Sequence, residues 1–220
     1  MTDLYLASQS PRRRELLRQL GVSFECLALS VPEQRAADES PEAYVNRLAL
    51  DKARAGWAHV REHRLPPAPV LGSDTIGVCQ GQVLEKPLDR EHALTMWGLM
   101  SGRAHEVMTA VALCDGERER SVLVRTHVFF RALTDAEMKA YWASGEPQDK
   151  AGGYGIQGLG GVFVERIEGS YSAVVGLPLA QTAELLNQFD LPWWGANPRT
   201  AQEQRVTGQP PRHTSTGADQ

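Results

Sequence analysis

One acidic residue of this chain stands inside an apolar segment. Asp74 lies in the run Leu71-Gly-Ser-Asp-Thr-Ile76, directly before the hydroxyl of Thr75. A carboxylate in an apolar strand is rarely structural filler, because burying it without a partner is costly. We therefore expect Asp74 to pair with a base, to hold a metal ion or to transfer protons.

The segment Ser8-Gln-Ser-Pro-Arg-Arg-Arg14 has the composition of an anion-binding helix start. It follows an expected strand and opens an expected helix, so the hydroxyls of Ser8 and Ser10 lie near free backbone N–H groups and the positive helix pole. Arg12 and Arg13 add forked donors that suit phosphate oxygens. A plain basic surface is the alternative reading of this segment.

Three lysines can reach the same site. Lys86 and Lys150 each follow an acidic residue at an expected strand or helix end. Lys52 shares a helix face with the apolar residues Val45 and Leu48, so it points toward the body of the protein. Several cations converging beside one acid in a strand suit a polyphosphate and a divalent metal better than a neutral substrate.

Two patterns match known motifs but lack their structural context. Gly153-Tyr-Gly-Ile-Gln-Gly158 fits the dinucleotide pattern G-x-G-x-x-G, yet further glycines and a strand follow it instead of a helix. His59-Val-Arg-Glu-His63 fits the zinc pattern H-x-x-E-H, yet it lies at a helix end without an obvious third ligand. We interpret the first as a glycine-rich loop and the second as a solvated helix end.

Composition excludes several classes of protein. The chain has 220 residues, of which 42% are hydrophobic and 23% charged, as in ordinary globular proteins. Its net charge of −4 argues against a general nucleic-acid binder. No apolar run approaches the ~18 residues of a membrane span, and the N-terminus opens on polar residues. The scattered cysteines, Cys26, Cys79 and Cys114, indicate reduced thiols, so we expect a soluble cytoplasmic protein.

Strand and helix signals alternate along the chain and must position these side chains. We expect strands over residues 4–7, 24–29, 70–79, 83–84, 105–113, 122–130 and 162–167. Helices are expected after Ser10-Pro11 and Ser40-Pro41, over residues 91–99, from the capping box at Thr134, and from about Pro178. The alternation, with hairpins in the middle, predicts an α/β fold with a mixed sheet. Residues 1–191 then form one domain, and the polar composition of residues 192–220 predicts a disordered tail.

Several blocks of the sequence together resemble the Maf-like nucleoside triphosphate pyrophosphatases. In chain order they are Leu6–Leu17, Leu71–Thr75, Lys86-Pro87, Ser101–Val107, Asp149–Gly158, Gly169–Tyr171 and Val175–Pro178. The resemblance implies an elongated mixed sheet flanked by helices, with two lobes around a central cleft, as in Maf and inosine-triphosphatase-like proteins. It also implies a homodimer that hydrolyses a nucleoside triphosphate to the monophosphate and pyrophosphate with a divalent cation, Mg²⁺ or Mn²⁺.

The resemblance assigns a role to each candidate site residue. Asp74 would accept a proton from the attacking water, and Asp74 and Glu33 would be metal ligands. The residues implied in substrate binding are Ser8, Ser10, Arg13, Lys52, Lys86 and Lys150.

Three positions distinguish the branches of this family. The branch that prefers 7-methyl-GTP has Ser-Pro-Trp-Arg, Ser-Asp-Gln and a glutamate in the glycine-rich loop. This chain has Arg12, Thr75 and Gln157 there, similar to the dTTP/UTP branch. A methylated guanine is cationic and suits an aromatic face and a carboxylate, whereas a glutamine amide can both donate to and accept from a neutral pyrimidine. We therefore expect hydrolysis of dTTP and UTP, with modified pyrimidine triphosphates as further substrates.

Three other functions stay open at this point. The chain could be a 7-methyl-GTP pyrophosphatase of the same family, or a non-catalytic nucleotide-binding regulator of cell division that has kept the pocket. It could also be a phosphatase acting on sugar phosphates or nucleoside monophosphates. Release of pyrophosphate, as opposed to free phosphate, separates the pyrophosphatase from the phosphatase.

Overall fold

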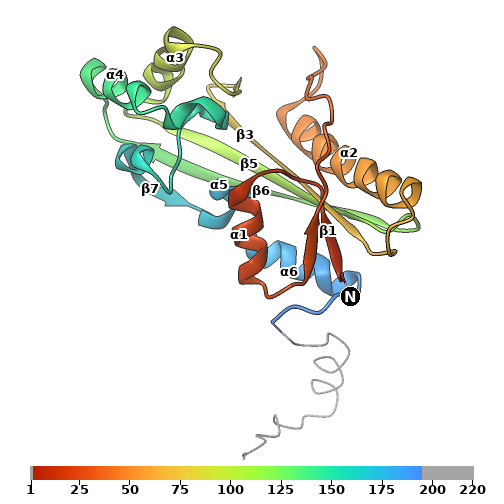
Figure 1. Ribbon diagram of the computed structural model, residues 1–220. Helices are drawn as coiled ribbons and strands as arrows, with labels where there is room; N and C mark the ends of the chain where they lie inside the picture. The colour runs from red at the N-terminus through yellow and green to blue at the C-terminus, as the bar shows by residue number, and fades with distance from the viewer. Residues whose placement is uncertain (1, 195–220) are drawn as a thin grey trace, which may run out of the picture.

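A computed structural model describes residues 2–194, the side chain of Asp149 excepted. Seven strands form one sheet in the order β2-β1-β3-β5-β6-β7, and β4 pairs with β3 beside this path (Figure 1). The strands are β1 (Leu4–Leu6), β2 (Phe24–Cys26), β3 (Val70–Cys79), β4 (Gln82–Leu84), β5 (Ala104–Cys114), β6 (Glu119–Phe130) and β7 (Val164–Glu168). The helices are α1 (Pro11–Gln19), α2 (Pro41–Glu62), α3 (Arg90–Met100), α4 (Asp135–Ala143), α5 (Tyr171–Val175) and α6 (Leu179–Gln188). Three short 3₁₀ helices are η1 (Glu146–Asp149), η2 (Ala151–Gly153) and η3 (Leu159–Phe163).

The sheet is mixed, which confirms the predicted fold class. β1 pairs in parallel with β2 and with β3, whereas β3, β5, β6 and β7 pair antiparallel in that order. The three central strands are long, with 10, 11 and 12 residues in β3, β5 and β6. Their length gives the sheet its elongated form (Figure 1).

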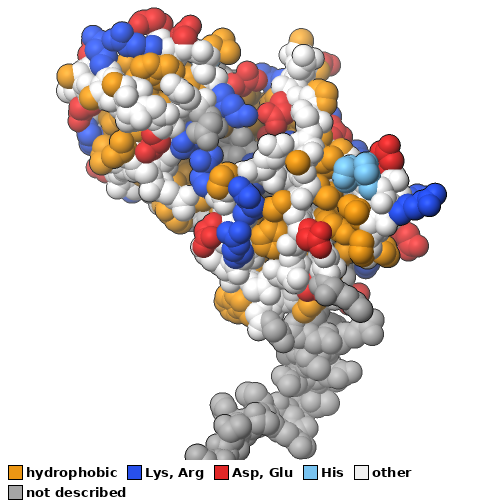
Figure 2. Space-filling model, viewed as in Figure 1, with side chains coloured by type: hydrophobic (Ala, Val, Ile, Leu, Met, Phe, Trp, Pro, Cys, Tyr) orange, Lys and Arg blue, Asp and Glu red, His pale blue; other side chains and the backbone are white. Residues whose placement is uncertain are grey.

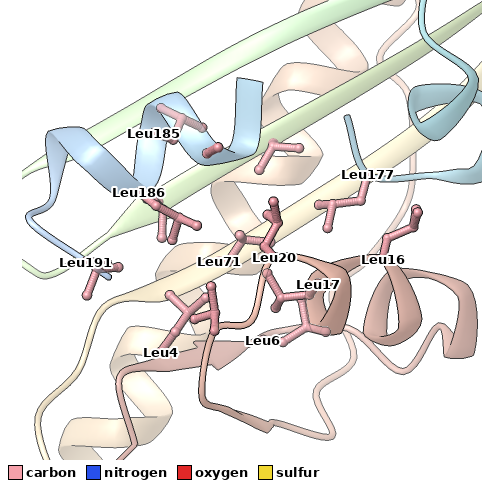
Figure 3. Close-up of a cluster of buried hydrophobic side chains, with 14 of the residues drawn as sticks. Leu4, Leu6, Leu16, Leu17, Leu20, Leu71, Leu177, Leu185, Leu186 and Leu191 are labelled. Atoms are coloured by element: carbon pink, nitrogen blue, oxygen red, sulfur yellow. The ribbon is translucent and has the colours of Figure 1, made fainter. Parts of the chain in front are cut away.

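Alternate residues of β5 pack into two different hydrophobic clusters on opposite faces of one end of the sheet. Val111 and Leu113 belong to a cluster with α1 and α6, and Figure 3 shows leucines of these helices pointing toward those of β1 and β3. The intervening residues Ala110 and Ala112 pack with α2 on the other face. This alternation follows from the two-residue period of a strand.

A third, aromatic core lies at the other end of the long strands. Trp97 of α3 packs near Tyr141 of α4 and Phe163 of η3. The centroid of its ring lies 5.2 Å from that of Tyr141 and 6.3 Å from that of Phe163. Figure 1 places α3 and α4 together over this end, away from α1 and α6. The molecule therefore has two lobes that share the long strands.

Local sequence signals explain where the elements begin. Ser10, Ser40 and Thr134 cap α1, α2 and α4 as predicted, each accepting a backbone N–H with its hydroxyl, and Thr134 forms the full capping box with Glu137. Gln80 and Gly81 connect β3 to β4 with φ values of 51° and 77°. Two residues with positive φ are typical of the tight hairpin turn expected there.

Some boundaries differ from those predicted. β2 ends at Cys26 because its partner β1 ends at Leu6, where the chain turns into the segment before α1. Val162 and Phe163 belong to η3, so β7 begins only at Val164. The five-residue α5 was not predicted, since a single turn carries too little periodicity to be detected.

The first residues of the predicted tail have defined contacts. The backbone N–H of Trp194 donates to Leu20 O at 2.8 Å, and its indole Nε1–H donates to Gln19 O at 2.7 Å. Trp193 donates from its indole to Asn187 Oδ1 at 2.9 Å. The rest of that tail, residues 195–220, lies outside the described residues. Within the described range, no helix combines the length and the apolar character needed to cross a membrane.

Candidate active site

A cavity of about 1220 Å³ lies between the two lobes and contains every candidate residue named from the sequence. Its walls come from the segment between β1 and α1, from α2 and β3, and from the loops around residues 84–88 and 146–158. The candidate residues that line it are Ser8, Ser10, Arg12, Arg13, Glu33, Lys52, Asp74, Thr75, Lys86, Lys150 and Gln157. Figure 2 shows Lys and Arg side chains gathered along the hollow between the lobes.

Asp74 and Lys52 form a buried ion pair at the centre of this cavity. Lys52 Nζ lies 2.6 Å from Asp74 Oδ1, and both side chains are largely buried. The contact depends on Gly72, where a Cβ would come within 2.2 Å of the Ala49 carbonyl oxygen. Because β3 has no side chain there, α2 packs close enough to place Lys52 beside the strand.

Glu33 shares the same ammonium group. Its Oε1 lies 2.6 Å from Lys52 Nζ, and its Oε2 lies 3.7 Å from the more exposed Lys86 Nζ. Burial would raise the pKa of the Glu33 carboxyl, but the hydrogen bond from Lys52 and the charge of Lys86 outweigh this and hold the pKa below its usual value. Glu33 and Asp74 therefore each place one carboxyl oxygen against the same ammonium group, that of Lys52.

Arg13 is fixed in the cavity wall by three contacts. Its Nε–H donates to Gly176 O at 2.9 Å, Nη1 donates to Ser8 Oγ at 3.4 Å, and Nη2 donates to Thr75 Oγ1 at 3.1 Å. Burial lowers the pKa of the guanidinium, and the charges of Asp74 and Glu33 oppose that change. Arginine keeps its charge under these conditions, so the site contains a positioned cation with further N–H groups for an anion.

Thr75 belongs to a buried hydrogen-bond chain. Thr109 Oγ1 donates to Ala173 O at 2.7 Å, which uses its only hydrogen. Thr75 Oγ1 lies 3.0 Å from Thr109 Oγ1 and must therefore donate to it while accepting from Arg13. Sequence reasoning missed Thr109, although a hydroxyl inside an apolar strand is the same kind of signal that singled out Asp74.

The carbonyl of Gly176 is a second feature that the sequence did not predict. It accepts from Arg13 Nε and from Ser73 Oγ, the latter at 3.1 Å. Gly176 has a φ of +128°, a conformation that favours glycine. Its role arises from the contact of α5 with α1 and β3, which lie far from it in sequence.

The glycine-rich loop closes the cavity on the side of the aromatic lobe. Lys150 donates from Nζ to Glu146 O, and the side chain of Gln157 is exposed at the cavity wall. The loop leads into η3 and the antiparallel strand β7, so it lacks the helix that a dinucleotide site requires. Glu146 also lines the cavity, and no sequence pattern predicted its place there.

The residues of the zinc-like pattern lie away from this cavity. The rings of His59 and His63 stack with centroids 3.9 Å apart, and His63 Nδ1 lies 3.0 Å from His59 O. That nitrogen is used at the end of α2, as expected for a helix terminus.

The carboxylates in the cavity fit a divalent cation bound together with its substrate. Among residues 2–194 no three His, Cys, Asp or Glu side chains form a metal cage. Mg²⁺ does not need one, because it is commonly held by one or two carboxylates, water and substrate phosphates. Glu33 and Asp74 supply two carboxylates that already face one cation position, occupied by Lys52 Nζ.

Comparisons with known proteins identify the family of this chain. A family model described as Maf-like protein matches residues 3–189. The dTTP/UTP pyrophosphatase of Escherichia coli O157:H7 is 58% identical over 190 residues, covering 86% of this chain and 94% of its own. The dTTP/UTP pyrophosphatase of Escherichia coli strain K12 is 57% identical over the same shares. Among solved structures, the Staphylococcus aureus Ham1 protein aligns over 58% of this chain and 71% of its own, with a TM-score of 0.41 and 10% identity.

Proposed function

The chain belongs to the Maf-like protein family, and from that premise we propose that it is a nucleoside triphosphate pyrophosphatase acting on dTTP and UTP. The products are the nucleoside monophosphate and pyrophosphate. The relatives that carry this activity in their names match the chain over 94% of their own length, and the family model over residues 3–189 includes every residue that lines the cavity.

One arrangement in the cavity carries the proposal: a carboxylate surrounded by cations from separate parts of the chain. Asp74 comes from β3, Lys52 from α2 and Arg13 from α1, while Lys86 and Lys150 come from two loops on the aromatic lobe. Positive charges fixed in place stabilise the charge that develops on phosphate oxygens during transfer. The phosphate oxygens of a triphosphate complement this distribution of positive charge, whereas a neutral substrate makes no use of it.

In the proposed mechanism, Asp74 takes a proton from the attacking water. Its Oδ1 accepts from Lys52, and among the described residues no hydrogen-bond donor pairs with its Oδ2. Water activated at Oδ2 attacks the α-phosphorus, the bond to the bridging oxygen breaks, and pyrophosphate leaves. Arg13 and the lysines hold the phosphates and offset the charge of the leaving group.

A divalent cation completes the proposal, with Glu33 and Asp74 as its protein ligands. When bound, it would neutralise charge on the phosphate oxygens and lower the pKa of coordinated water. The two carboxyl groups already bind one positive charge, the Lys52 ammonium. This contact supports the proposal that they also stabilise a metal cation beside it.

Gln157 supports selection of the pyrimidine base. Its side chain is exposed at the cavity wall, so its amide is available to the N–H and C=O groups of uracil or thymine. Phosphate contacts alone cannot distinguish one base from another. The two other positions of the predicted specificity set, Arg12 and Thr75, line the same cavity.

A substrate panel tests the proposed function directly. We expect the purified chain with Mg²⁺ or Mn²⁺ to release pyrophosphate from dTTP and UTP faster than from CTP, GTP or 7-methyl-GTP. Release of free phosphate would indicate a phosphatase, and tight binding without turnover would indicate a non-catalytic regulator. Fastest turnover of 7-methyl-GTP would assign the chain to the other branch.

Location and assembly are further parts of the proposal. The three cysteines are free thiols, which supports a reducing compartment such as the cytoplasm. The net charge of −4 gives no support to nucleic acid as a partner. A homodimer is expected from the family resemblance, and light scattering after size-exclusion chromatography measures it.

A further inference from the structure

The backbone on both sides of Gln157 is hydrogen-bonded to one carboxylate, that of Glu146, either directly or through the hydroxyl of Tyr141. On the C-terminal side, the backbone N–H of Leu159 donates to Glu146 Oε2 at 2.8 Å, and that of Gly160 donates to Oε1 at 3.1 Å. On the N-terminal side, the N–H of Gly155 donates to Tyr141 Oη at 3.0 Å.

Tyr141 completes the connection. Its hydroxyl donates to Glu146 Oε1 at 2.8 Å while it accepts from Gly155. The segment from Gly155 to Gly160 is therefore bound at both ends to one carboxylate, directly or through one hydroxyl. Gln157 lies between these two attachments.

This arrangement explains two of the three glycines in the pattern that failed as a dinucleotide motif, Gly155 and Gly158, and also explains Gly160 beyond it. A Cβ at Gly158 would lie 2.3 Å from Glu146 Oε2, and one at Gly155 would lie 3.0 Å from Oε1. A Cβ at Gly160 would lie 2.5 Å from Tyr141 Oη. The glycines let the backbone close around an anion, as in phosphate loops, but the anion here belongs to the protein itself.

The carboxylate is held as an anion in this position. Burial would raise the pKa of Glu146, but hydrogen bonds from the N–H groups of Gly160 and Leu159 outweigh it, so the pKa lies below its usual value. Hydrogen bonds to a charged acceptor are stronger than neutral ones. Glu146 therefore stabilises one loop conformation at neutral pH.

We propose that Glu146 is a positioning residue for base recognition: with Tyr141 it holds the loop 155–160 so that Gln157 faces the nucleobase. The proposal rests on the proposed function, since it concerns selectivity among nucleoside triphosphates. Glu146 need not touch the substrate for this role. Its removal should affect recognition of the base and spare recognition of the phosphates.

The experiment compares Glu146→Gln, Glu146→Ala and Tyr141→Phe with the wild type. The readouts are kcat and KM for dTTP and GTP, and the inhibition constant of inorganic tripolyphosphate, which has phosphates but no base. We expect the dTTP-to-GTP ratio of kcat/KM to fall about tenfold in Glu146→Ala, mainly through KM for dTTP, because unsatisfied loop donors release Gln157. Glu146→Gln and Tyr141→Phe should show smaller losses, since each keeps part of the hydrogen-bond set.

Tripolyphosphate separates positioning from general damage. Its inhibition constant should stay within about twofold of the wild-type value in all three variants, since its contacts are electrostatic and unrelated to the base. Glu137→Gln is the matched control: Glu137 is also a carboxylate bound by a hydroxyl and a backbone N–H, in the capping box of α4 and outside the cavity. It should lose stability without losing selectivity.

The outcomes separate the two proposals. Unchanged selectivity in both Glu146→Ala and Tyr141→Phe would overturn the positioning role, as would an equal loss of dTTP and tripolyphosphate binding. A wild type without pyrophosphate release would overturn the proposed function instead. The positioning role would then be tested by binding, with calorimetric affinities for dTTP and GTP in each variant.

Discussion

The guanidinium of Arg13 donates to the hydroxyl of Thr75 at 3.1 Å, one residue along β3 from Asp74. Thr75 was predicted from sequence to select the base, yet its hydroxyl is committed to Arg13 and to Thr109. The position that differs between family branches is therefore connected to the residue expected to hold the phosphates.

Replacement of Thr75 by valine should thus weaken all triphosphates alike. Valine keeps the shape but removes the acceptor for Arg13 and the donor to Thr109, and we expect KM to rise about tenfold for dTTP and GTP together. Thr75→Ser keeps the hydroxyl and should remain near wild type. Kinetics with both substrates measure this, and a loss confined to dTTP would show that Thr75 contacts the base.

Asp74→Asn should leave folding and nucleotide binding intact but remove most turnover. Asparagine keeps an acceptor for Lys52 and loses the basic oxygen, and general-base contributions are typically ~10²–10⁴-fold in kcat. Single-turnover kinetics with dTTP and a binding measurement give both values. Asp51→Asn is the control, because Asp51 pairs with Arg47 and Arg54 on α2, outside the cavity. Near wild-type turnover of Asp74→Asn would place the base elsewhere.

Arg13→Ala should weaken triphosphate binding more than Lys86→Ala. Arg13 is held by Gly176, Ser8 and Thr75, so its charge is already oriented toward the cavity. Lys86 has a side chain that is 61% exposed and one distant partner, so solvent and salt screen it more strongly. We expect tripolyphosphate inhibition constants at low and high salt to show the larger loss for Arg13→Ala. The opposite order would contradict this account of the phosphate site.

The sequence predicted the parts of the site that depend on local signals. Ser10 before Pro11 identified the start of α1, and the charge of Asp74 stood out in an apolar strand. Gly176 lies in one of the blocks that resemble the family, but neither the role of its carbonyl nor that of Glu146 was predicted, because both depend on contacts with residues distant in sequence or on hydrogen bonds to backbone groups. Neither kind of contact leaves a periodic signal.

The same limit explains the differences in the fold. The mixed order of the sheet follows from long strands with strong hairpin signals, which the sequence contains. The five residues of α5 and the docking of Trp194 on Gln19 and Leu20 depend on packing between distant segments. A polar composition after Pro192 could not show that two tryptophans at its start find partners.

His105 should make stability depend on pH between about 4 and 6.5. The ring is buried in the aromatic lobe, its Nε2 lies 2.8 Å from Tyr154 Oη, and burial lowers its pKa from 6.5 to about 4. As the pH falls below 6.5, His105 of the unfolded chain takes up a proton that the folded protein excludes. The free energy of unfolding therefore decreases with falling pH, and the decrease is complete at about pH 4. The full loss is on the order of 3 kcal/mol.

Urea unfolding of the wild type and His105→Gln at pH 7 and pH 5 measures this effect. Glutamine can keep a hydrogen bond to Tyr154 but does not titrate. We expect the wild type to lose about 2 kcal/mol more than the variant between these values, while the carboxylates contribute equally to both proteins. Equal losses would show that His105 can be protonated in the folded protein.

Gln157→Glu should lower kcat/KM for dTTP and UTP by about tenfold, because a carboxylate loses the amide donor and faces a pyrimidine carbonyl. Conversion toward 7-methyl-GTP should need Arg12→Trp as well, since an aromatic face and a negative charge suit a cationic base. Two variants can be compared, one that keeps the hydrogen bond from Arg13 to Thr75 and one that removes it. The double variant Arg12→Trp/Gln157→Glu keeps Thr75 and should turn over 7-methyl-GTP faster than the triple variant that adds Thr75→Gln, whose longer side chain displaces Arg13. The measurement is kcat/KM for dTTP, UTP, CTP, GTP and 7-methyl-GTP on the wild type and each variant. A triple variant faster than the double one would mean that position 75 acts on the base directly.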